Sequence, residues 1–164
     1  MDLVLTPRGA GKGSYDGALA VRELRVQDAP VLAELLSAIS VIGLLEQLGG
    51  EGLLFNTVDA RFTLSPDRVQ IVESAAMGAS LGVSMAGAYG LKSGRMELRG
   101  VVSPIYLVNA LGQIVSRRGE GLFGFNYTIS GTAKAPTVSV NPLSILTPGF
   151  FREIFRRDPP EVTQ

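Results

Sequence analysis

Histidine and cysteine are both absent from this chain of 164 residues. Without cysteine there is no disulfide, no thiolate metal ligand and no cysteine nucleophile, and the redox compartment stays undetermined. Without histidine, the commonest general base near neutral pH and the commonest metal ligand are missing as well. The composition therefore predicts a protein that is not an enzyme, with no catalytic residues, no cofactor and no metal.

The chain also has no net charge at neutral pH, because its fifteen basic and fifteen acidic residues cancel. Such a chain lacks the broad positive field that nucleic-acid binding normally requires. A hydrophobic fraction of 46% in a chain of this length is enough to bury the core of one domain. We therefore expect one folded domain that does not bind nucleic acid.

The remaining polar residues form no catalytic pattern. The glycine-rich stretch Arg8–Ser14 lacks the spacing of a phosphate-binding loop, and we interpret it as a turn. No basic segment and apolar stretch of a secretory signal follow Met1, which suggests either a cytosolic protein or, as we favour, a piece of a longer chain. Most of the scattered carboxylates lie where turns, caps or outward strand positions would place them. These carboxylates include Asp2, Asp16, Asp28, Asp59, Asp67 and Asp158.

Alternation with period two is the dominant pattern, and it predicts strands with one apolar and one polar face. Within Val58–Leu64 every second residue is apolar, and Ser65–Arg68 then supplies the chemistry of a tight turn. Similar rows follow up to Val140, after a turn that we expect to contain Pro136. Glycines within these rows permit bulges and bends. The expected fold is mainly β with interspersed helices (α+β): a curved antiparallel β-meander with an apolar face or groove.

One long and one or two short helices are expected to cover this face. The long helix, of about twenty residues, should begin after Asp28 as N-cap and end at Gly49–Gly50. Its glutamates and Pro30 argue against a membrane span, so we expect it to be buried or to plug the groove. The shorter helices are predicted near residues 105–115 and 148–157.

The order of three segments carries a family resemblance. The first segment is Val58–Leu64 with the turn that follows it, and the second is Met96–Pro104. The third is Tyr127–Pro142, in which a strand ends in Ser-Gly-Thr and a proline precedes a final strand that runs into Asn-Pro. This order resembles that of AsmA-like C-terminal domains over roughly residues 13–157. We therefore expect one AsmA-like domain over residues 1–164, with 1–12 assigned to the end of a preceding β repeat and 142–164 to an amphipathic helix and tail.

The resemblance implies a function without catalysis. AsmA-like proteins are bacterial envelope proteins related to bridge-like lipid-transfer proteins, anchored in the inner membrane, with periplasmic β-structure. The chain is accordingly expected to bind phospholipid or another acyl-chain lipid on the periplasmic side, and to serve lipid transport between the inner and outer membranes and outer-membrane assembly. Its protein partners in the envelope are not identified. The alternative is a structural cap or protein-interaction domain of a larger periplasmic β protein with no lipid ligand.

Both functions assign roles to the same apolar row. The row either lines a lipid groove or forms an ordinary packed core, because alternation reports burial and not what does the burying. The residues of the predicted lipid groove are Val58, Ala60, Phe62, Leu64, Leu81, Val83, Met85, Phe123, Phe125, Tyr127 and Ile129.

A membrane contact is predicted at the C-terminus. Apolar and basic side chains alternate there at helical spacing, as in a helix lying in a membrane interface. A helix docked on its own sheet, with Glu153 and Arg157 paired, is the alternative. The predicted contact residues are Phe150, Phe151, Arg152, Ile154, Phe155, Arg156 and Arg157.

Liposome flotation tests this contact. The intact chain should float with anionic vesicles at low salt, because its phenylalanines would enter the acyl boundary. A chain truncated after Asn141, and the double variant Phe151→Ser/Phe155→Ser, should float less. Equal flotation of all three, or no flotation of the intact chain, would leave the segment a role in packing alone.

Overall fold

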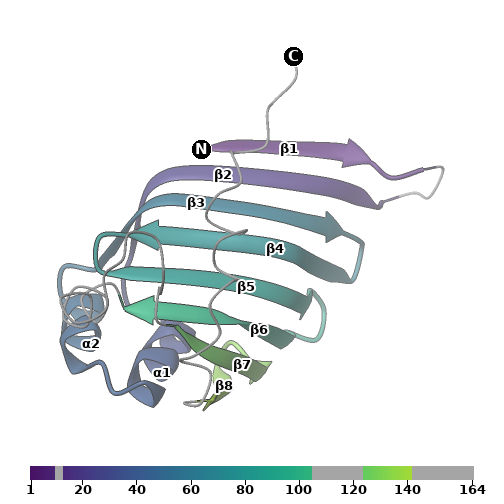
Figure 1. The fold of residues 1–164 in the computed structure, drawn as a ribbon. Helices are drawn as coiled ribbons and strands as arrows, with labels where there is room; N and C mark the ends of the chain where they lie inside the picture. The colour runs from purple at the N-terminus through teal and green to yellow at the C-terminus, as the bar shows by residue number, and fades with distance from the viewer. Residues whose placement is uncertain (10–12, 105–123, 142–164) are drawn as a thin grey trace.

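A computed structural model describes residues 1–9, 13–104 and 124–141 of the chain. Its strands form one antiparallel sheet of eight, ordered as they occur in the chain (Figure 1). This confirms the predicted antiparallel meander and the mainly β class. The strands are β1 Asp2–Pro7, β2 Tyr15–Val26, β3 Leu53–Leu64, β4 Arg68–Gly78, β5 Leu81–Gly90, β6 Arg95–Pro104, β7 Phe125–Thr132 and β8 Ala135–Asn141.

The β3–β4 hairpin has the turn that its sequence predicts. The Ser65 amide donates to the Arg68 carbonyl at 2.8 Å, and the Ser65 hydroxyl donates to the same carbonyl at 3.0 Å. Pro66 and Asp67 occupy the two central positions, where proline pre-sets φ and aspartate favours a turn. This turn fixes the register of β3 against β4.

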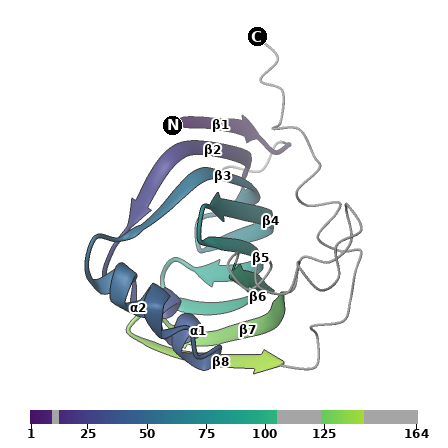
Figure 2. The ribbon, with the colours of Figure 1, turned by 60° about the vertical axis from the view of Figure 1, so that its left-hand side comes forward.

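Irregularities in the register accompany the curl of the sheet. Asn56 has no partner in β4 between the paired Phe55 and Thr57, and Val72 is an additional residue of β4 between Ile71 and Glu73. Such bulges bend a strand and increase its twist. On β2, opposite Asn56, Glu23 adopts a left-handed φ of 57°. Figure 2 shows β2 and β3 bending toward the helices while the sheet curls from β1 to β8, which confirms the predicted curvature.

The bulge at Asn56 also changes the phase of the apolar alternation. Leu53 and Phe55 precede it at odd positions, whereas Val58 follows at an even position, yet all three join one hydrophobic cluster. The additional residue moves odd-numbered side chains from one face to the other. One face of β3 is thereby apolar along its whole length.

The long helix that we predicted is wrong, because the segment forms two helices, α1 (Pro30–Ala38) and α2 (Ile42–Gly49). Ser40 adopts φ 57° after α1, its amide donates to the Ser37 carbonyl, and the Val41 amide donates to the Leu36 carbonyl. This pair of bonds is a Schellman motif, which ends a helix. The predicted end at Gly49–Gly50 is confirmed, with Gly50 as C-cap.

Other details of the prediction also need correction. The N-cap of α1 is Ala29 with Pro30 at the first helical turn, so Asp28 is not the cap. Pro136 lies within β8 opposite Gly131 rather than in the turn. A proline is compatible with an edge strand, where an amide can be spared. The short helices predicted near 105–115 and 148–157 lie outside the described residues.

The core lies where the helices meet one end of the sheet. Leu35 and Leu36 of α1 and Leu44 and Leu48 of α2 are buried in one cluster with side chains of the sheet. Helix α1 contacts β8, and α2 contacts β3. The two helices thus pack at this end of the sheet, and the covering of the apolar face by one long and one or two short helices stays a prediction. Among the described residues no helix is long and apolar enough to cross a membrane.

Two glycines of the sheet lie beneath aromatic rings. Gly17 pairs with Phe62, and a side chain at position 17 would collide with the Phe62 ring. Gly100 pairs with Tyr127, and a Cβ there would lie 2.8 Å from the Tyr127 hydroxyl. An aromatic ring over a cross-strand glycine covers backbone that would otherwise be poorly packed. We conclude that these glycines are required by close packing.

The substitution Gly100→Ala should therefore lower the free energy of unfolding by about 1–3 kcal/mol, because the methyl group would overpack the site. As a matched control, Gly43→Ala in α2 meets nothing within 4 Å and should raise stability by up to about 1 kcal/mol. Urea denaturation measures both. Equal stability of Gly100→Ala and the unchanged chain would contradict the close packing.

Candidate functional site

The sheet places the predicted apolar row on one face. Residues directly opposite in antiparallel pairs share a face, so the register can be followed from strand to strand. Val58 leads through Ala76, Val83 and Val102 to Phe125. The rows through Ala60 and through Phe62 similarly reach Tyr127 and Ile129. Phe123 lies outside the described residues, as do all the residues of the predicted C-terminal membrane contact.

The face is wider than the sequence analysis predicted. It begins on β1 and on β2, and it includes further aliphatic residues of β4 and β6. The sequence predicts a strand around residues 18–26, within β2, but the predicted row contained no residue of β1 or β2. The short Leu-Val-Leu run after Asp2 was the only signal for β1. The added residues are Leu3, Leu5, Leu19, Val21, Val69, Ile71 and Leu98.

Exposure increases across this face from the helices toward β1. Near the helices Leu81 is 2% exposed and Val102 is fully buried. On β1, at the opposite edge of the sheet, Leu3 and Leu5 are 51% and 42% exposed. The apolar face therefore has a closed end and an open end.

The predicted residues divide between these two ends. Leu81, Tyr127 and Ile129 belong to the buried cluster, and Val58, Val83 and Phe125 pack against it. Among the described residues, Ala60, Phe62, Leu64 and Met85 are half-buried and belong neither to the cluster nor to the side chains packed on it. These four lie on the same face as Ile71 and Leu19. We call the part of the face formed by Leu3, Leu5, Leu19, Ala60, Phe62, Leu64, Ile71 and Met85 the open apolar surface.

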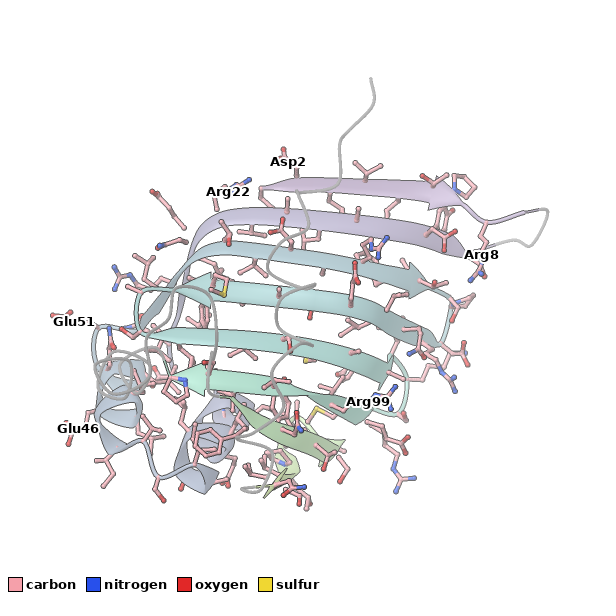
Figure 3. The ribbon with its side chains drawn as sticks, viewed as in Figure 1. Asp2, Arg8, Arg22, Glu46, Glu51 and Arg99 are labelled. Atoms are coloured by element: carbon pink, nitrogen blue, oxygen red, sulfur yellow. The ribbon has the colours of Figure 1, made fainter. Side chains whose placement is uncertain are left out.

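The charged residues of the paired strands lie on the opposite face of the sheet, together with some aliphatic side chains such as Val101. Arg61 forms an ion pair with Glu73, and the Thr63 hydroxyl donates to Asp16 at 3.3 Å. Figure 3 shows the charged side chains labelled in it projecting away from the sheet and the helices. By contrast, the paired residues of the apolar face include no Asp, Glu, Lys or Arg. The two faces thus differ sharply in their affinity for water.

Tyr127 is a polar group within the buried part of the apolar face. Its hydroxyl donates a hydrogen bond of 2.8 Å to the Ser84 carbonyl, and the Ser84 hydroxyl accepts the Val101 amide at 3.2 Å. Burial raises the pKa of the Tyr127 hydroxyl above its ordinary value. The tyrosine therefore acts here as a neutral donor that joins β7 to β5 across β6.

The described residues contain no group of three or more acidic, histidine or cysteine side chains that could hold a metal ion. Comparisons were made with protein-family models, with curated proteins and with solved structures, and none of them matches this chain. The resemblance to AsmA-like domains, and the function that it implies, therefore stay predictions.

The buried tyrosine predicts a loss of stability at alkaline pH. The unfolded chain ionises Tyr127 near pH 10, whereas the folded chain keeps it neutral to higher pH, so the free energy of unfolding should fall as pH rises above about 10. Tyr127→Phe should remove this part of the pH dependence. It should also cost about 1–3 kcal/mol at pH 8, because the buried Ser84 carbonyl loses its donor.

Urea denaturation between pH 8 and 11 measures these changes. Tyr89→Phe is the matched control, because Tyr89 lies half-buried on the same face and pairs with Met96. If the Tyr127→Phe variant and the unchanged chain lost stability in parallel, the buried hydroxyl would not be the cause.

Proposed function

We propose that this protein is a non-enzymatic lipid-binding module whose open apolar surface holds acyl chains. The observation that carries the proposal is the position of this surface. It continues the hydrophobic core across the sheet, lies outside the core cluster, and becomes exposed at Leu3 and Leu5.

Acyl chains suit such a surface for a simple reason. Transfer of one methylene group from water to an apolar contact contributes about 0.8 kcal/mol, and the contribution is non-directional. A surface of aliphatic and aromatic side chains with no charged residue can therefore take an acyl chain without specific hydrogen bonds. The polar headgroup would stay in water beyond the edge of the sheet.

The biological setting is part of the proposal and depends on the family resemblance. It places the protein at the periplasmic side of a bacterial envelope, with a role in phospholipid transport between the inner and outer membranes and in outer-membrane assembly. A membrane surface and a phospholipid are the partners that this setting supplies. The curved sheet with one apolar face supports it, since a lipid path needs a continuous apolar surface.

A structural cap or protein-interaction domain is the second candidate. It is favoured by the burial of Leu81, Tyr127 and Ile129, which belong to the hydrophobic core. In that case the whole face serves packing, and no lipid is bound. The two candidates differ in what covers Phe62, Ile71 and Met85.

A charge on the open apolar surface should weaken lipid binding more than folding. We expect Ile71→Asp to lower the amount of phospholipid that copurifies, as counted by native mass spectrometry, by fivefold or more, while the circular dichroism spectrum is retained. The neighbouring Val72→Asp is a closely matched control, because Val72 is the bulge residue and is 56% exposed. It should bind lipid as the unchanged chain does.

A core variant completes the experiment. Phe125 packs against the buried cluster, so Phe125→Asp should unfold the domain, since an unpaired buried charge costs several kcal/mol. If Ile71→Asp also unfolded the domain, or if no lipid copurified with the unchanged chain, the structural cap would be the better account.

A further inference from the structure

The two edges of the sheet differ in their protection. The β8 edge carries Pro136 and lies against α1. Among the described residues β1 pairs with β2 alone, at the edge far from the helices (Figure 1). All six residues of β1 are exposed, including Leu3, Val4 and Leu5. An aliphatic edge strand without such protection is a template for another strand.

Within the described part of the chain, the backbone of β1 has hydrogen-bonding groups without a partner at this edge. The Arg8 amide donates to the Ser14 carbonyl at 2.9 Å, which marks this pair as hydrogen-bonded toward β2. Bonded and non-bonded pairs alternate along an antiparallel ladder, so Thr6, Val4 and Asp2 also direct their groups to β2. The amides and carbonyls of Leu3 and Leu5 then point to the free edge. Pro7 is at an outward position too, which suits its lack of an amide proton.

We propose that β1 pairs with β1 of a second copy of this chain, antiparallel and with Val4 opposite the partner's Val4. In this register the Leu3 amide and carbonyl bond to the partner's Leu5, and the twofold axis repeats both bonds. The two sheets then continue through the interface. This proposal concerns the sheet edge and does not require that the apolar face bind lipid.

The faces of the two copies allow only registers that differ by an even number of residues. Among these, Val4 at the axis pairs Leu3 with Leu5 on both strands and leaves Pro7, which has no amide proton, outside these bonds. With Val4 at the axis, Leu3 lies opposite the partner's Leu5, and both belong to the apolar face. A slip by one residue would place the apolar face of one copy beside the polar face of the other. The chosen register instead joins the two open apolar surfaces edge to edge.

The charges at the ends of β1 favour antiparallel over parallel pairing. Asp2 lies at one end and Arg8 just beyond the other, as labelled in Figure 3. Antiparallel pairing places Arg8 diagonal to the partner's Asp2, within reach of its long side chain. In the described residues Arg8 makes a 3.9 Å ion pair with Asp16, and both side chains are well exposed. Parallel pairing would bring like charges together.

Single cysteines test the register directly, because the chain contains none. In the proposed dimer residue 4 faces its own symmetry mate in a non-hydrogen-bonded pair, with Cα atoms about 4.5 Å apart. Val4→Cys should therefore form a disulfide-linked dimer under mild oxidation. Thr6→Cys is the control on the same face of the same strand. In the proposed dimer the two copies of residue 6 would lie about 13 Å apart, so crosslinking should be at least tenfold slower.

Sedimentation of the unchanged chain gives an independent measurement. It should show a concentration-dependent dimer, and Leu5→Pro should raise the dissociation constant tenfold or more, because the outward amide of residue 5 is lost. Circular dichroism and thermal unfolding check that Leu5→Pro still folds. A monomer at all concentrations, equal crosslinking of the two cysteine variants, or assemblies that grow beyond the dimer would each overturn the proposal.

Discussion

The strand register is the constraint on which the other features of this structure depend. Each of the eight strands pairs with its neighbours in the chain, and the registers keep Asp, Glu, Lys and Arg off the apolar face. Because side chains alternate with period two, a slip of one residue in any strand would move its apolar set to the wet face. The bulge at Asn56 illustrates this constraint. The additional residue changes the phase of the alternation, so that Phe55 and Val58 lie on the same apolar face although one number is odd and the other even.

A continuous apolar face does not by itself create a closed core. The helices bury the part of the face near Leu81 and Val102, whereas the residues Leu3 and Leu5 are about half exposed to solvent. A soluble antiparallel sheet usually has one face on a core and one in water. Here one face serves as core at one end and open surface at the other, and the lipid proposal rests on that gradient.

The sequence predicted the features that depend on local chemistry. Alternation in Val58–Leu64 and the Ser65–Arg68 turn were sufficient to place a half-buried strand and a hairpin. The break between α1 and α2 was missed because Ser40, rather than glycine, takes the left-handed position there. The exposure of Phe62 or Met85 could not be predicted, because alternation assigns a side chain to a face and not to a depth. That depth depends on helices packed from elsewhere in the chain.

The chain-order topology also determines how assembly can proceed. Most of the described strands join through short turns, so their contacts form between residues close in sequence and close loops of low entropic cost. The β2–β3 pairing is different, because α1 and α2 lie between its strands. Pairing can thus begin within the β3–β6 hairpins, whereas the β2–β3 pairing has to close a longer loop that contains the helical pair. Because all six residues of β1 are exposed and none joins the core cluster, we expect this edge strand to fray before the centre of the sheet, which gives the sheet a kinetic direction as well as a spatial one.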